Sequence, residues 1–147
     1  MDKPNSYLFV CSRPSYNITR KKGVLGFLDT APTLNNILKS INPGDLIFFY
    51  ITKEKILDGY CEVTKPLYFD LMPLYPHRDD ICASRVSIKM KVSNAAISFQ
   101  KYIVPFVSFI PKERKPRATY TSFMVTNLIR LTPDDAKMML LEFQRHE

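Results

Sequence analysis

Basic residues alternate with tyrosines in two parts of the chain, and this combination can bind nucleic acid. The first group is Arg13, Tyr16, Arg20, Lys21 and Lys22, and the second is Lys112, Arg114, Lys115, Arg117 and Tyr120. Aromatic faces stack on nucleobases, while lysine and arginine neutralise phosphates. The alternative interpretation places the tyrosines in or beside the core and the charges on a solvated face. Composition alone favours that alternative.

The net charge also bears on possible partners. The chain carries 21 lysines and arginines against 14 aspartates and glutamates, a formal net charge of +7. Such an excess favours polyanionic partners, chiefly nucleic acid and less often an anionic membrane surface. It is equally consistent with a charge that merely keeps a protein soluble.

Residues for catalysis or metal binding do not form a set in this sequence. The two histidines, His77 and His146, are far apart, whereas zinc sites need four ligands with paired spacing. His77 is the one candidate base for a nucleophile, and neither a nucleophile elbow nor a glycine-rich phosphate loop occurs. The pairs Asp79-Asp80 and Asp134-Asp135 fit a solvated loop and a helix start. We expect no enzyme, no metal and no cofactor.

Cysteine usage and hydropathy predict a cytoplasmic protein without a membrane segment. Cys11, Cys61 and Cys82 are odd in number and widely spaced, which indicates free thiols in a reducing compartment. The first residues lack a signal-peptide pattern. The longest apolar run, Leu46 to Ile51, is far too short to span a bilayer.

The elements that must position these residues can be read from the apolar pattern of one domain, residues 1–147. We expect a central strand at Tyr7 to Cys11, a strand covered on both faces at Leu46 to Thr52, and strands at Ile56 to Thr64 and Ser84 to Val92. Helices are predicted from Pro14 to Lys22, from Thr33 to Ile41, and from a cap at Thr132 to about Arg145.

The remaining segments have weaker signals. Tyr68 to Asp80 is predicted as an irregular loop, Ile103 to Ile110 as a strand or extended loop, Pro111 to Arg117 as a basic loop, and Thr119 to Leu128 as a helix. Gly23 and Gly26 bracket Val24-Leu25, which suggests a backbone bend or close approach.

Several phrases in this order resemble the EVE domain of the PUA-like superfamily. They are YLFVC at residues 7–11, GVLGF at 23–27, INPGDLIFFY at 41–50, LDGYCEVT at 57–64, YFD at 68–70 and RVSIK at 85–89. The resemblance covers residues 7 to 92, and the later helix with its TPDD start also fits. It implies an α+β fold, namely a strongly bent, mixed PUA-like β-barrel with flanking helices.

The same resemblance implies a nucleic-acid-binding module that recognises a base of RNA or DNA, modified or not, in a pocket at the barrel mouth. EVE domains are similar to YTH domains, which read methylated adenine in RNA. Such recognition fits a base splayed into a pocket and held by stacking and hydrogen bonds.

Carried onto this sequence, the resemblance predicts the residues of the site. Base contacts are expected from Ser12, Arg13, Tyr16, Leu25, Tyr50, Asp70, Arg85 and Tyr120. Phosphate contacts are expected from Lys21, Lys22, Lys112, Arg114, Lys115 and Arg117.

One departure from the family pattern leaves alternatives open. The chain has no tryptophan, and Leu25 stands where the family has one. Leu25 and Phe27 could therefore be core residues, and Arg85 and Asp70 a structural ion pair. The alternative functions are a protein–protein adaptor, or a domain that binds a small molecule or nucleoside in a degenerate pocket.

Overall fold

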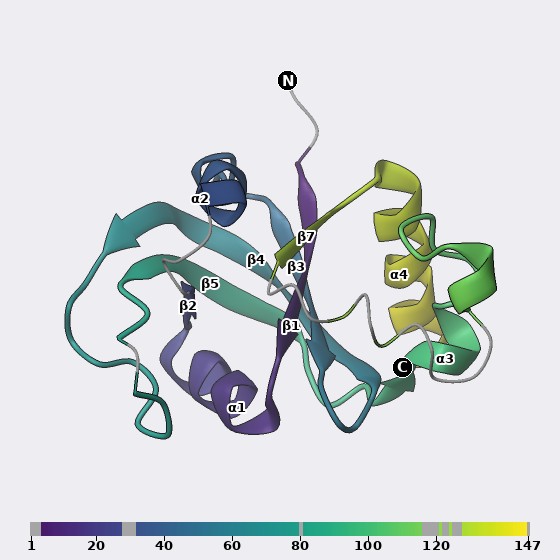
Figure 1. Ribbon diagram of the computed structural model, residues 1–147, viewed down its shortest axis with the longest axis horizontal. Coiled ribbons are helices and arrows are strands. Elements are labelled where there is room, and N and C mark those ends of the chain that lie inside the picture. Colours follow the sequence, from purple (N-terminus) through teal and green to yellow (C-terminus); the bar gives the residue numbers. More distant parts are fainter. Residues whose placement is uncertain are drawn as a thin grey trace.

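The backbone of the protein, in a computed structural model, is organised around one mixed β-sheet (Figure 1). The structure describes residues 4–27, 32–79, 81–115, 121, 124 and 128–146, and for residues 32–35 the backbone alone. The strands are β1 (Ser6–Cys11), β2 (Val24–Phe27), β3 (Leu46–Ile51), β4 (Ile56–Phe69), β5 (Ser84–Val92), β6 (Ile97–Ser98) and β7 (Leu128–Leu131).

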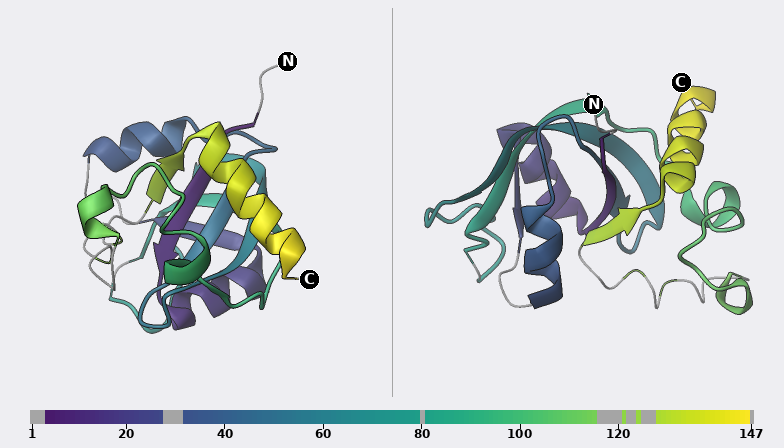
Figure 2. Two further views of the ribbon diagram at one scale, coloured as in Figure 1. Left: turned by 90° about the vertical axis from the view of Figure 1, so that its right-hand side faces the viewer. Right: turned by 90° about the horizontal axis from the view of Figure 1, so that it is seen from above.

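The strand order is β2-β5-β4-β3-β1-β7, with β6 added to β4. β1 and β3 run parallel, and the other pairs are antiparallel. Register shifts along β4, at Tyr60/Cys61 and on both sides of Lys65, bend this long strand. The sheet curls into a half-barrel (Figure 2). The prediction of an α+β fold with a strongly bent mixed sheet is confirmed.

Helices cover both faces of the sheet, as Figures 1 and 2 show. α1 (Arg13–Lys22) and α2 (Pro32–Lys39) lie on one side, while α3 (Phe99–Tyr102) and α4 (Pro133–Arg145) lie on the other. A short 3₁₀ turn, η1, spans Lys112–Arg114. No helix in the described part of the chain is long and apolar enough to cross a membrane.

The core has two halves that meet at β3. Ile47, Phe49 and Ile51 pack on the side of α1, whereas Phe48 and Tyr50 pack on the side of α4. This alternation confirms that the strand is covered on both faces. It also explains why its sequence is apolar throughout, since each side chain enters one core or the other.

Local signals explain the ends of α1 and α4. Ser12 and Thr132 accept hydrogen bonds from backbone N–H groups three residues later, and proline occupies the first turn of each helix. Gly23 ends α1 in the left-handed conformation, with φ at 67°. The two helices begin and end close to where the sequence predicts.

Several segments differ from the sequence prediction. β4 extends to Phe69, past the predicted end at Thr64 and into the predicted loop. Residues 103–110 form turns rather than a strand, because Ile103 and Val104 both donate to the Phe99 carbonyl at the end of α3. The helix predicted for Thr119 to Leu128 falls mostly outside the described residues, and Leu128 itself begins β7. β2, β6, β7 and α3 were not predicted.

Candidate functional site

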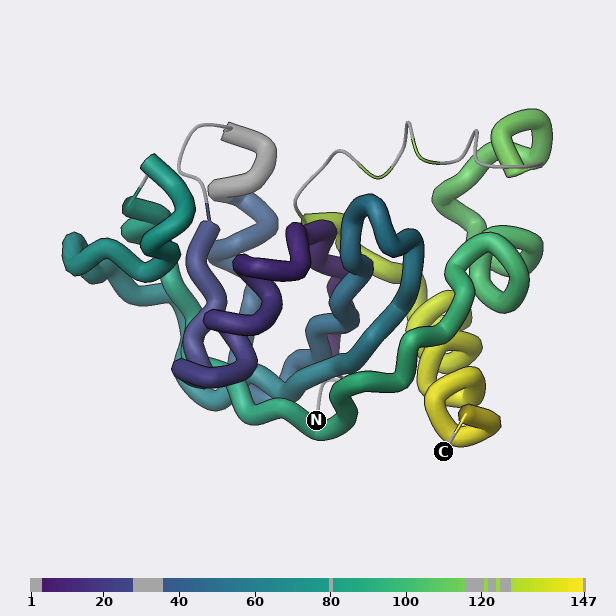
Figure 3. Tube along the Cα trace, turned by 90° about the horizontal axis from the view of Figure 1, so that it is seen from below, coloured from purple at the N-terminus to yellow at the C-terminus, as the bar shows by residue number. Residues whose placement is uncertain are grey.

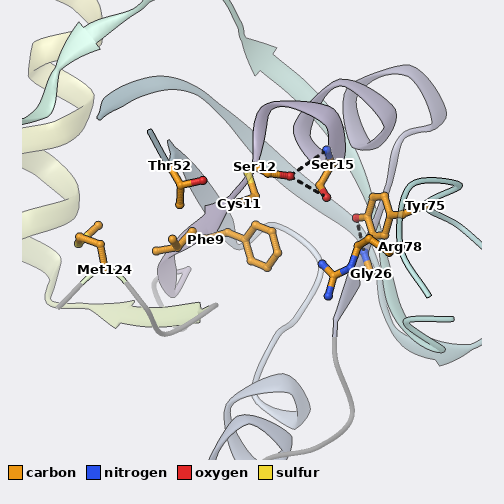
Figure 4. A pocket seen from close by; sticks show the side chains of 10 residues that line it. Phe9, Cys11, Ser12, Ser15, Gly26, Thr52, Tyr75, Arg78 and Met124 are labelled. Carbon is orange, nitrogen blue, oxygen red and sulfur yellow. Dashed lines mark hydrogen bonds between the residues drawn. The ribbon is translucent and has the colours of Figure 1, made fainter. Parts of the chain in front are cut away.

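A cavity of about 360 Å³ opens where β1 ends and α1 begins (Figure 4). Its volume lies in the range of small-molecule sites. The wall is apolar along β1 and polar at the start of α1 and on the 70–83 loop. The lining residues are Phe9, Val10, Cys11, Ser12, Ser15, Gly26, Thr52, Tyr75, Arg78 and Met124.

The polar side of the cavity contains a chain of three hydrogen-bonding side chains. The Ser12 hydroxyl donates to Ser15 Oγ at 3.2 Å. Ser15 Oγ lies 2.9 Å from Nε2 of His77, which comes from the 70–83 loop. Ser15 is buried, whereas His77 is exposed. The chain therefore connects the cavity wall to a titratable group at the surface.

Tyr75 fixes the loop side of the cavity. Its hydroxyl lies 2.8 Å from Thr19 Oγ1 and accepts a hydrogen bond of 3.1 Å from the Gly26 N–H. Burial raises the pKa of the Tyr75 hydroxyl, so the group stays neutral. The Arg78 guanidinium lies 5.9 Å from the Tyr75 ring centroid and also lines the cavity.

Arg85 holds the 70–83 loop from beneath. Its guanidinium donates to the carbonyls of Met72, Ile81 and Cys82, and it pairs with Asp70 at 3.3 Å. Arg85 is 4% exposed. Neither Arg85 nor Asp70 lines the cavity, although both are predicted to contact a base. The ion pair between them matches the alternative that the sequence left open.

Arg13, another predicted base contact, joins α1 to the turn between β3 and β4. Its guanidinium makes two hydrogen bonds to Glu54, of 2.6 and 2.8 Å, and reaches buried Asp58 at 3.4 Å. The hydrogen bonds to Glu54 raise the pKa of Arg13, and the same bonds lower the pKa of Glu54. The Arg13 side chain is thus committed to the fold.

Three more predicted base contacts lie in the core. Tyr16 and Leu25 are fully buried, and Tyr50 is 2% exposed. The Tyr16 ring has the guanidinium groups of Arg13 and Arg20 over it, at 5.5 and 4.7 Å from its centroid. Burial is the main cause that raises the pKa of Tyr16. Of the predicted base contacts that the structure describes, Ser12 lines the cavity. Tyr120 lies outside the described residues.

The described parts of the two basic clusters lie on opposite sides of the sheet, on α1 and near η1 (Figures 1 and 3). Lys21, Lys22, Lys112 and Arg114 are exposed. Lys115 instead donates to the carbonyls of Pro105 and Val107, at 3.2 and 3.0 Å. Arg117 is outside the described residues.

Several cavity residues were missed from the sequence. Ser15 follows Ser12 at the start of a capped helix and could have been found from that spacing. Gly26 belongs to a phrase noted above, and its backbone lies under Leu74 and Cys82, which leave no room for a Cβ. Thr52, Tyr75, Arg78 and Met124 have no local signal. They meet in space from separate turns and loops.

The groups near the cavity that could take part in catalysis are Ser15, His77 and Cys11. Ser15 and His77 have the spacing of a nucleophile and a base, but no carboxylate in the described residues bonds to the other nitrogen of His77. Burial raises the pKa of the Cys11 thiol, which therefore lacks the thiolate that reactive cysteines use. Among the described residues, no group of three or more His, Cys, Asp or Glu side chains could hold a metal ion.

Comparison with known proteins identifies the fold. The YTH domain of Zygosaccharomyces rouxii MRB1, in complex with N6-methyladenosine RNA, matches with a TM-score of 0.71 at 14% identity, over 97% of this chain and 88% of that one. The Mmi1 YTH domain complexed with RNA matches with a TM-score of 0.68 at 12% identity, over 97% and 79%.

The chain has the YTH/PUA-like fold. A hypothetical protein from Leishmania major has the same arrangement, with a TM-score of 0.64 at 13% identity, over 97% of this chain and 96% of that one. The sequence matches no protein-family profile and no curated protein. The PUA-like part of the resemblance is confirmed at the level of fold, while the EVE family stays a prediction.

Proposed function

We propose that this protein is an RNA-binding module that accepts one unpaired nucleobase in the cavity at the start of α1. The cavity carries the proposal, because it combines apolar walls with a small set of polar groups, as base-recognition sites do. Solved YTH domains of the same fold are complexed with RNA, in one case RNA that contains N6-methyladenosine. The net charge of +7 supports a polyanionic partner.

The walls suit a flat ring rather than a tightly caged cation. Phe9 and Tyr75 are the two aromatic residues that line the cavity, and Ser12, Ser15 and Arg78 supply hydrogen-bonding groups. In Figure 4 the Phe9 ring and the Arg78 side chain point toward the same space. A base seated there would have apolar contact on its faces and polar contact at its edge. Methylated adenine is the first modified base to test.

A binding experiment tests this function. We would measure the affinity of short single-stranded RNAs that differ at one position, adenine or N6-methyladenine, with DNA of the same sequence for comparison. Thr52→Phe would fill the cavity and should lower the affinity for RNA at least about fivefold, since a base contributes about 1–3 kcal/mol by stacking. Thr64→Phe, on an exposed part of β4, is the matched control.

The expected result is RNA binding that Thr52→Phe weakens and Thr64→Phe leaves unchanged. Failure of all RNAs to bind at low salt would refute the function. Equal binding by wild type and Thr52→Phe would place the RNA elsewhere on the surface.

A second candidate function is supported by one surface feature. Phe69, Leu71 and Met72 are 70%, 76% and 70% exposed at the end of β4. Neighbouring exposed apolar side chains are typical of protein-binding surfaces. A protein–protein adaptor would lose its partner on Phe69→Ser and Met72→Ser substitution, whereas RNA binding in the cavity would not change.

A further inference from the structure

In the hydrogen-bonded series Ser12–Ser15–His77, each bond has a defined donor and acceptor. Ser12 Oγ accepts a bond of 3.4 Å from the Ser15 N–H, and the Ser12 hydroxyl donates to Ser15 Oγ. Since Ser15 Oγ already accepts from Ser12, its own proton needs an acceptor. Nε2 of His77, at 2.9 Å, supplies one when the ring carries its proton on Nδ1. In this state Ser12 Oγ, which lines the cavity, has one lone pair left to accept a hydrogen bond from a ligand.

Protonation of His77 would reverse this order. An imidazolium ring has only N–H donors, so Nε2 must donate to Ser15 Oγ. The Ser15 hydroxyl then donates to Ser12 Oγ, and the Ser12 hydroxyl turns toward the cavity. The wall that offered an acceptor now offers a donor. No atom has to move far, because each step rotates one hydroxyl group.

We propose that His77, acting through Ser15, sets whether Ser12 accepts or donates a hydrogen bond to the bound base, and so makes base preference depend on pH. This inference rests on the proposed function of the cavity. With neutral His77, the cavity favours a base that presents an amino group. With protonated His77, it favours a base that presents a carbonyl oxygen in the same place.

The groups packed against His77 come from α1 and from its own loop. Ser15 faces it from α1, and Tyr75 packs against its ring at 5.9 Å between centroids. Arg78 and Asp79 follow it on the loop. Burial keeps the hydroxyl of Tyr75 and the thiol of Cys11 protonated. Histidine is the side-chain type that changes charge between about pH 5 and 8.

Two matched pairs of RNA probe the direction of the hydrogen bond. Within each pair one position differs, adenosine against inosine or cytidine against uridine, so that an amino group is exchanged for a carbonyl oxygen. We would measure the affinity ratio within each pair between about pH 5.5 and 7.5. A ratio removes the general effect of a new positive charge on RNA affinity.

We expect the preference for the amino base to fall about threefold to tenfold as the pH is lowered from about 7.5 to about 5.5, the effect of one hydrogen bond. His77→Gln can still bond to Ser15 but does not titrate, so its ratio should not depend on pH. His146→Gln removes the other histidine, which packs against Tyr102 and Glu142 at the end of α4, and should behave as wild type.

A ratio that is independent of pH in the wild type, or a pH dependence that survives in His77→Gln, would overturn the inference while leaving RNA binding intact. If no RNA binds, the proposed function fails. NMR of the free protein then tests whether Ser12, Ser15 and His77 are connected by hydrogen bonds. The Ser12 and Ser15 amide resonances should then titrate with the midpoint of the His77 ring, and amide shifts that ignore this midpoint would refute the relay.

Discussion

Several residues that could contact a ligand by their chemistry instead hold the fold together. Arg13 reaches the buried carboxylate of Asp58, Arg85 donates to backbone carbonyls beneath the loop, and Tyr16 fills the core beside Phe49. A buried carbonyl or carboxylate without a partner costs about 1–3 kcal/mol or more. The chemistry that makes arginine and tyrosine suitable for RNA also makes them suitable for this role. Residue type alone cannot separate the two.

Gly59 shows how tightly Tyr16 is packed. A Cβ at this position would lie 2.4 Å from the Val92 carbonyl oxygen and 2.5 Å from the Tyr16 hydroxyl. Gly59→Ala should destabilise the protein by about 2 kcal/mol or more, because the Val92 backbone cannot yield. Chemical denaturation measures the change. Thr64→Ala, at an exposed position on β4, should shift stability by less than about 0.5 kcal/mol. A Gly59→Ala protein as stable as wild type would show that this packing is loose.

At the scale of elements, the 70–83 loop connects the core to the candidate site. One side of the loop is tied to Arg85, and the other side presents Tyr75, His77 and Arg78 to the start of α1. The loop has no regular secondary structure over most of its length. Its conformation therefore depends on these side-chain contacts.

Removal of the Arg85 guanidinium should loosen this loop. Arg85→Met keeps an apolar stem of similar length but leaves carbonyls of Ile81 and Cys82 without their donor. We expect a loss of about 2–4 kcal/mol in unfolding free energy and a loss of amide protection in residues 70–83. Hydrogen exchange is the measurement, with exposed Arg130→Met as the control. Unchanged protection in the loop would show that other contacts hold it.

At the scale of the whole molecule, two exposed basic pairs lie on opposite sides of the sheet. Lys21 and Lys22 close α1, while Lys112 and Arg114 lie on η1, on the far side of the sheet (Figures 1 and 3). A short strand with one base in the cavity cannot reach both clusters. A longer RNA could contact both by wrapping around the molecule.

Salt dependence of binding tests this division. For single strands, log K falls with log salt by about 0.7 for each phosphate contact. Two double variants carry glutamine in place of Lys21 and Lys22, or in place of Lys112 and Arg114. For a short oligonucleotide, at most one of these two variants should have a smaller slope than the wild type. Fluorescence anisotropy across a salt series measures the slope. If both double variants reduced the slope, the short oligonucleotide would contact both basic clusters at once.

The strands and helices with strong local signals were predictable from the sequence. β1, β3, β5, α1 and α4 follow from apolar alternation, from a continuous apolar run, or from a serine or threonine cap followed by proline. β7 was not predictable from the sequence, since this edge strand of four residues is stabilised by its pairing with β1 rather than by its own residue pattern. The extension of β4 has the same cause, because β5 pairs with it as far as Phe69.

The sequence by itself determined the α+β class, the capped start of α4 and a basic chain without a catalytic set. Tertiary structure alone decided which polar residues face the cavity. Ser15 and His77 are separated by 62 positions in the chain and by 2.9 Å in space. A hydrogen bond at that separation leaves no periodic trace, because its geometry is set by the packing of the loop against α1. For the same reason Arg85 and Tyr16 lie in the interior while Ser12 reaches the site.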